Sequence, residues 1–182
     1  MLRDQLEHLI RACADISGDD DIVVVGSQAI LGSHPDPPPA MLFSMEADVY
    51  PRNRPERTDL IDGAIGEGSP FHATFEYYAH GVGPETAKAP QGWPGRLVPL
   101  SSAGTRGATG WCMEAHDLVL AKCVADRDKD WAFAAAALRE GIVSGDELLA
   151  RIALLPVEDA HKARIAHALD ALVRRPNARP ED

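Results

Sequence analysis

The spacing of apolar and polar residues in the first fifty positions predicts a helix followed by two strands. Apolar residues recur at helical spacing over residues 2–15, which predicts an amphipathic helix. The β-branched run Ile22–Val25 is bounded by polar and turn residues, as is typical of a buried strand. Residues 28–31 predict the start of a short helix, and residues 44–50 predict a second strand.

The middle of the chain predicts a proline loop, a helix and a third strand. Residues 32–39 contain four prolines and therefore form a loop. Asn53 and Glu56 stand at the spacing of a capping box, which predicts a helix that continues to about residue 66. The alternation over residues 72–79 predicts a strand.

From residue 114 onward the pattern becomes helical. Two short strands are expected before it, joined as a hairpin, at residues 96–100 and 109–113. Helices are expected at residues 114–126, 128–140, 144–155 and 157–173. The order of elements predicts an α+β protein with a mixed sheet: an α/β core at residues 1–113, a helical C-terminal part at 114–175 packed on that core, and a flexible tail at 176–182.

Composition and charge narrow the class of protein. Hydrophobic residues make up 45% and charged residues 25% of the chain, which is ordinary for a globular protein. The formal net charge of −10 disfavours broad, non-specific binding to nucleic acid. No apolar run is long enough for a membrane span, and the first residues lack the order of a signal peptide, so we expect a cytoplasmic protein.

Several kinds of site find no support in the sequence. Cys13, Cys112 and Cys123 are far apart and lack zinc-ligand spacing, which predicts reduced structural thiols. The seven histidines have no HxxxH or HxH spacing. The chain contains no P-loop motif, no dinucleotide-binding G-x-G-x-x-G after a strand, and no G-x-S-x-G of a serine hydrolase.

Two short features carry candidate chemistry. Glu46 and Asp48 lie two residues apart on the second predicted strand, so both carboxylates point to one face, where a divalent cation such as Mg²⁺ would relieve their repulsion. Gly26 and Ser27 stand where a buried strand turns into a helix, a place suited to phosphate. Taken singly, each feature also fits a simpler structure: an exposed strand face with solvated acids, or an ordinary turn.

Together, in this order, these features resemble the nucleotidyltransferase superfamily. The segments GSQAILG (26–32), SMEADVYP (44–51) and LIDGAIGEGSPF (60–71) look like an uncharacterised branch near the abortive-infection type IV toxins, which are bacterial toxin-type nucleotidyltransferases. The resemblance covers residues 20–155. It implies that Gly26 and Ser27 bind the triphosphate of a nucleotide and that Glu46 and Asp48 are catalytic metal ligands.

The resemblance continues in the helical part. The matching positions are Asp117, Leu118, Lys122, Ala125, Arg127, Lys129 and Asp130. By this resemblance Lys122 would reach toward the nucleotide phosphates, although a surface lysine of a helix fits the pattern as well. Arg127 and Asp130 are spaced to pair with each other within one helical turn.

The chain also departs from the superfamily. The first acid is Glu46 where aspartate is usual, and active members commonly have a third carboxylate on the next strand. Glu76 is the candidate for that position if residues 72–79 form the strand, and Glu67 and Asp62 are alternatives. The resemblance thus leaves two functions open: an enzyme, or a catalytically inactive protein of the same fold that binds nucleotide or a partner.

The expected activity is the transfer of a nucleoside monophosphate from an NTP, with Mg²⁺, to a hydroxyl of RNA, protein or a small molecule. By resemblance alone, the setting would be a toxin–antitoxin or phage-defence module, with a cognate antitoxin as partner. No membrane partner is expected.

Overall fold

The computed structural model describes residues 1–174, so the tail predicted at 176–182 lies outside the described residues. The chain divides into two compact units. The first comprises Met1–Ala87 and Pro94–Glu114, and the second comprises Lys88–Trp93 and the chain from Ala115 onward. A five-stranded mixed sheet with helices forms the first unit, and the second is helical, in agreement with the α+β class predicted.

The sheet of the first unit has the strand order β3-β2-β1-β5-β4. Its strands are β1 (Asp21–Val25), β2 (Glu46–Pro51), β3 (Tyr78–Gly81), β4 (Val98–Leu100) and β5 (Thr109–Cys112). The central strand β1 pairs antiparallel with β2 and parallel with β5. β2 pairs parallel with β3, and β4 and β5 form the predicted antiparallel pair.

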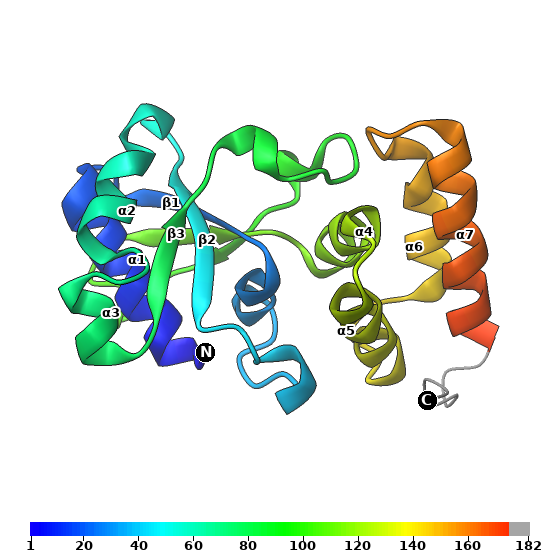
Figure 1. Ribbon diagram of the computed structural model, residues 1–182, viewed down its shortest axis with the longest axis horizontal. Coiled ribbons are helices and arrows are strands. Elements are labelled where there is room, and N and C mark those ends of the chain that lie inside the picture. The colour runs from blue at the N-terminus through cyan, green and yellow to red at the C-terminus, as the bar shows by residue number, and fades with distance from the viewer. Residues whose placement is uncertain (175–182) are drawn as a thin grey trace. The chain divides into compact units, whose positions relative to one another are not determined.

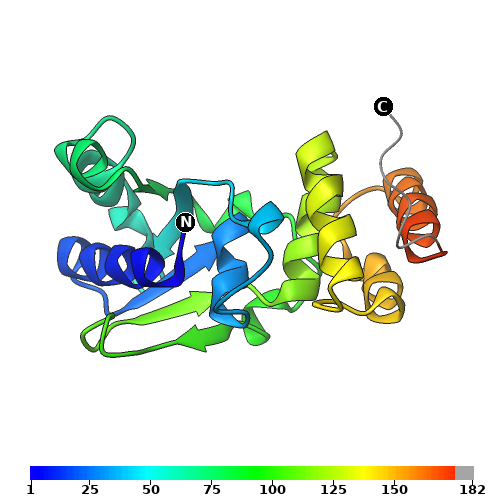
Figure 2. The same ribbon diagram turned by 90° about the horizontal axis from the view of Figure 1, so that it is seen from below.

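Three α-helices of the first unit gather on one side of the sheet, as Figures 1 and 2 show. They are α1 (Arg3–Ser17), α2 (Thr58–Ile65) and α3 (Pro70–Phe75). Helix α1 packs so closely on β5 that a Cβ atom at Gly110 would overlap the side chain of Ile10. The face of the sheet that carries Gly110 is therefore the face that α1 covers.

Strand register then assigns the two faces of β2. Cys112, two residues beyond Gly110, pairs with Val24, which in turn pairs with Val49. Because paired residues share a face, Val49 and Ala47 point toward α1, and both are fully buried. Glu46 and Asp48 therefore point to the opposite face of the sheet, as their spacing predicts.

The strand predicted at residues 72–79 is wrong. Residues Pro70–Phe75 form helix α3, and β3 begins only at Tyr78. The side chain of Ser69 accepts a hydrogen bond from the backbone N–H of His72, and Pro70 occupies the first helical position. A serine N-cap followed by proline is a helix start, and it outweighs the short alternation of apolar residues.

The capping box predicted at Asn53 and Glu56 is also absent. The side-chain amide of Asn53 donates instead to Asp19, at 3.0 Å, and residues Pro55–Arg57 form a 3₁₀ turn before α2 begins at Thr58. Asn53 thus ties the end of β2 to the turn before β1.

The described part of the second unit contains the helices predicted from the apolar spacing. They are α4 (Ala115–Ala125), α5 (Asp128–Arg139), α6 (Gly145–Arg151), which runs into a 3₁₀ turn at Ile152–Leu154, and α7 (Asp159–Arg174). The side chain of Ser144 caps α6 by accepting from the backbone N–H of Glu147. Gly141, with φ of +67°, follows the end of α5.

Cys13, Cys112 and Cys123 are buried free thiols, as predicted. Burial raises the pKa of Cys112 and of Cys123 to about 12, so these thiols stay protonated. Among residues 1–174, no helix combines the length and apolar character that crossing a membrane requires.

Candidate functional site

The predicted phosphate turn and the predicted acid pair meet at the end of β1. Val25, the last residue of β1, pairs with Asp48 of β2, and Gly26 follows directly. Gly26 has φ of +65° and ψ of −167°, a region that only glycine occupies readily. A Cβ atom at this position would overlap the Asp48 carboxylate. Glycine therefore lets the turn and the carboxylate come into contact.

Ser27 begins the segment that the sequence predicts as a short helix. The segment Ser27–Gly32 is a 3₁₀ helix of six residues, so the short helix predicted here has the tighter 3₁₀ form. The buried side chain of Gln28 donates to the backbone carbonyl of Ser44 at 3.0 Å, and Ser44 Oγ accepts from the backbone N–H of Glu46. These bonds fix the turn after β1 to the start of β2.

Each acid of β2 has a partner on β3 in the residue directly across from it. Glu46 is in register with Tyr78 and Asp48 with His80. The Tyr78 hydroxyl donates to Glu46 Oε2 at 2.9 Å. His80 Nδ1 lies 3.0 Å from Asp48 Oδ1, and an ionised carboxylate can only accept in this bond. The two acids are thus oriented by a phenol and an imidazole from the neighbouring strand.

The pKa of Tyr78 is raised by burial and by the negative charges around its hydroxyl. Burial, the hydrogen bond to Glu46, and the negative charges of Glu46, Glu67 and Asp48 together raise the pKa of Tyr78 to about 12. Three carboxylates therefore act on one hydroxyl. The electrostatic field around Tyr78 is negative and favours a cation.

The site remains accessible to solvent. The side chain of Asp48 is 27% exposed and that of His80 is 50% exposed. Because Asp48 Oδ1 bonds to His80, its second oxygen lies toward Gly26. The carboxylate can therefore serve two neighbours at once, one through each oxygen.

Glu76 does not lie on the third strand, where it was expected as the third carboxylate. Glu76 is the C-cap of α3, with φ of +64°, and is exposed rather than placed on β3. Of the two alternatives, Asp62 accepts from the backbone N–H of Gly81 at 3.0 Å, whereas the charge of Glu67 reaches Tyr78. In the part of the chain that the structure describes, no three acidic, histidine or cysteine side chains are placed to hold one metal ion.

Lys122 lies on α4 in the second unit and is almost fully buried there. Its Nζ bonds to Asp130 Oδ1 at 3.2 Å and stands 4.6 Å from the centre of the Phe133 ring. Burial lowers the pKa of Lys122, and the charge of Asp130 partly opposes this effect. Arg127 Nε bonds to Asp130 Oδ2 at 2.6 Å, which confirms the predicted Arg127–Asp130 pair. The role of Lys122 toward phosphates stays a prediction.

Tyr78 and His80 were not among the predicted site residues. The sequence did hold a signal for them, since Ser69-Pro70 marks a helix start and moves the third strand onward to residues 78–81. On that strand the two residues alternate with small ones, at the same two-residue spacing as Glu46 and Asp48 on β2.

Comparisons with protein-family models, with curated proteins and with solved structures found no match.

Proposed function

We propose that the first unit binds a nucleoside triphosphate with Mg²⁺ at Gly26, Ser27 and the Glu46–Asp48 pair, and that the chain transfers a nucleoside monophosphate from it to a hydroxyl. The observation that carries this proposal is the contact between Gly26 and the Asp48 carboxylate. It brings a turn without a side chain beside a pair of aligned acids. A phosphate at the turn and a cation on the acids would then be neighbours.

The donor set suits Mg²⁺ that arrives with its nucleotide. Mg²⁺ keeps several waters and is usually bound through one or two carboxylates and the substrate phosphates rather than by a full set of protein ligands. Glu46 and Asp48 supply two carboxylates, and the described residues add no third group to them. When bound, Mg²⁺ would offset the charge that develops on the leaving pyrophosphate.

The chain's own residues have distinct tasks in this proposal. Glu46 and Asp48 hold the cation, while Tyr78 and His80 keep the two carboxylates in place through the bonds from β3. Gly26 and Ser27 hold phosphate. A role of Lys122 toward phosphate rests on the resemblance alone, because this lysine is buried in the second unit beside Asp130. The acceptor, whether RNA, protein or a small molecule, and a cognate antitoxin as partner rest on the resemblance to the toxin-type nucleotidyltransferases.

Calorimetry with the full chain tests binding. We expect ATP, GTP, CTP or UTP to bind when Mg²⁺ is present, and Mg²⁺ alone to bind weakly because the protein offers only two carboxylates. Asp48→Asn and Glu46→Gln should each weaken binding of the Mg²⁺–nucleotide complex by about tenfold or more, the effect of losing one charge-assisted contact. Asp59→Asn is the matched control, since it removes an exposed acid from α2. Equal binding by all three variants would refute the site.

A second function is favoured by one observation: β3 places His80, not an acid, across from Asp48. A protein of this kind could bind nucleotide without transferring it. Bound nucleotide should raise the melting temperature by mass action in either case. Release of pyrophosphate in the presence of RNA or protein acceptors would identify the enzyme, whereas a raised melting temperature without pyrophosphate would identify the inactive binder. No rise with any nucleotide would exclude both.

A further inference from the structure

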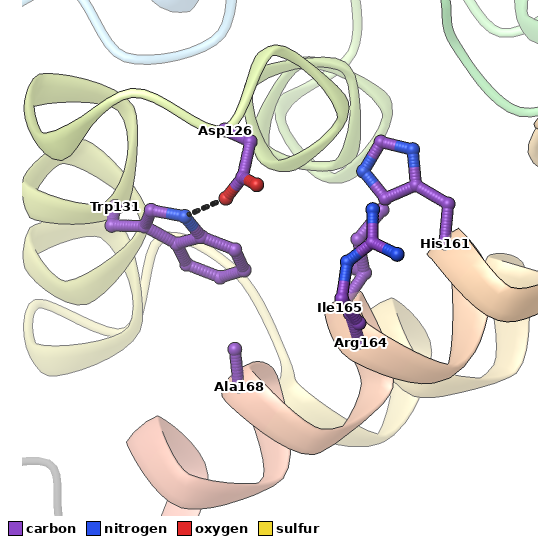
Figure 3. A pocket seen from close by; sticks show the side chains of 6 residues that line it. All are labelled: Asp126, Trp131, His161, Arg164, Ile165 and Ala168. Atoms are coloured by element: carbon purple, nitrogen blue, oxygen red, sulfur yellow. Dashed lines mark hydrogen bonds between the residues drawn. The ribbon is translucent and has the colours of Figure 1, made fainter.

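A second site is suggested by a pocket that lies wholly within the helical unit. Its volume is about 180 Å³, well below the roughly 300–1,000 Å³ of pockets for drug-sized ligands. The pocket lies between one face of α7 on one side and the turn that joins α4 to α5, with the start of α5, on the other (Figure 3). Its lining residues are Asp126, Trp131, His161, Arg164, Ile165 and Ala168. A nucleoside triphosphate is too large for it, so this pocket is separate from the site proposed above.

One wall of the pocket carries a carboxylate held against an indole. Asp126 has φ of +56°, a left-handed conformation, and its Oδ1 accepts a hydrogen bond of 2.7 Å from Trp131 Nε1. Among residues 1–174, Asp126 forms no ion pair with a Lys or Arg side chain. Its negative charge is therefore not balanced by a salt bridge.

The other wall, on α7, carries positive charge and an imidazole. Figure 3 shows His161, Arg164 and Ile165 on the side of the pocket that faces Asp126 and Trp131. Within the described residues, Arg164 likewise has no ion-pair partner. His161 Nε2 is buried and has no hydrogen-bond partner. A buried nitrogen in this state gains from a ligand group that completes its hydrogen bond. As an N–H donor, it would pair with a carboxylate.

These walls favour a ligand with both charges. A simple anion would meet the charge of Asp126, and a simple cation would meet the charge of Arg164. A small zwitterion can place an ammonium group toward Asp126 and a carboxylate toward Arg164 and His161. Its apolar part would then contact Trp131 and Ile165. We infer that this pocket binds a free α-amino acid with an aliphatic side chain.

The test uses leucine as the probe and the indole N–H signal of Trp131 in a ¹H–¹⁵N spectrum of the full chain as the readout. Trp131→Phe assigns that signal. We expect saturable shifts with leucine at millimolar concentration. The amine-free analogue 4-methylpentanoate and the carboxylate-free analogue 3-methylbutylamine should bind about tenfold more weakly or worse, because each lacks one charged contact.

Two conservative variants locate the binding. Arg164→Gln removes the positive charge from an exposed side chain, and Asp126→Asn keeps both the acceptor for the indole and a residue type that tolerates positive φ. Each should weaken leucine binding about tenfold, whereas Arg139→Gln, an exposed arginine at the end of α5, should leave it unchanged. Absence of a saturable shift, equal binding of either analogue, or unchanged binding in both pocket variants would overturn the inference.

Discussion

Two acids in this chain differ in burial and in ion pairing: Asp48 in the first unit and Asp130 in the second. Asp130 is fully buried and bonds to two cations, Lys122 and Arg127. Burial alone would raise its pKa, but the hydrogen bonds from Arg127 and the charge of Lys122 outweigh it, so the pKa of Asp130 is lowered. Asp48 is partly exposed and bonds to a histidine.

The difference separates a structural charge from one suited to binding. Asp130 has its charge balanced inside the protein, and removing it would leave buried positive charge without a partner. Asp48, Glu46 and Glu67 all contribute negative charge around Tyr78. A cation from outside the chain would therefore bind more favourably beside Asp48 than beside Asp130.

The largest effect is expected at Asp130. Asp130→Asn keeps the shape but removes the negative charge, which leaves Lys122 buried beside a neutral group. We expect a loss of about 3 kcal/mol in the free energy of unfolding, the scale for breaking a buried ion pair. Urea denaturation measures it. Asp128→Asn, an exposed acid in the first turn of the same helix, should cost less than about 1 kcal/mol. Equal losses in the two variants would contradict a stabilising role for the buried ion pairs of Asp130.

An intermediate effect is expected at Gly26. Gly26→Ala forces a side chain into a glycine-only conformation and against the Asp48 carboxylate, so we expect a loss of about 2 kcal/mol in the free energy of unfolding. Gly68→Ala is the control, because Gly68 also has positive φ but faces open space, and it should lose only about 1 kcal/mol.

The double variant Gly26→Ala with Asp48→Ala isolates the contact. Removing the carboxylate should recover part of the loss caused by Gly26→Ala, since the overlap disappears while the backbone strain stays. Strictly additive losses in urea denaturation would mean that Gly26 and Asp48 do not act on each other.

The smallest effect is a change in one titration. In the folded chain Tyr78 should titrate near pH 12 rather than 10, as followed by the ¹³C shift of its Cζ atom. A raised pKa in the folded state means that the associated stability is fully present below pH 10 and is lost as the pH rises from 10 to about 12. Glu46→Gln should lower the pKa of Tyr78, whereas Glu56→Gln should not, since Glu56 is exposed and is not among the charges that raise this pKa. A Tyr78 that ignores Glu46 would contradict the bond between them.

The sequence predicted those parts of the fold that have strong local signals. The β-branched run of β1, the acid alternation of β2 and the long amphipathic helices α1 and α7 all formed near the expected bounds. The strand prediction within residues 69–81 was wrong because a short apolar alternation and a Ser-Pro helix start compete there. The capping by Ser69 decides in favour of the helix. The capping box predicted at Asn53 was wrong for another reason. The partner of Asn53, Asp19, is 34 residues away, so no local pattern indicates the bond between them.

The candidate site was predictable only in part. Spacing along β2 was enough to place Glu46 and Asp48 on one face. Their partners Tyr78 and His80 depend on which strand pairs with β2 and in which register, and a single sequence does not encode that locally. The contact between Gly26 and Asp48 depends in the same way on the antiparallel register of β1 and β2.

The contact between Gly26 and Asp48 also has a consequence for how this chain can change over evolutionary time. Because a Cβ atom at position 26 would overlap the Asp48 carboxylate, a side chain at position 26 disfavours aspartate in its present position at 48. A larger residue at position 26 would push the Asp48 carboxylate aside, and with it one ligand of the cation site proposed here. A change from glycine at this turn would therefore act on the proposed cation site as well as on the turn.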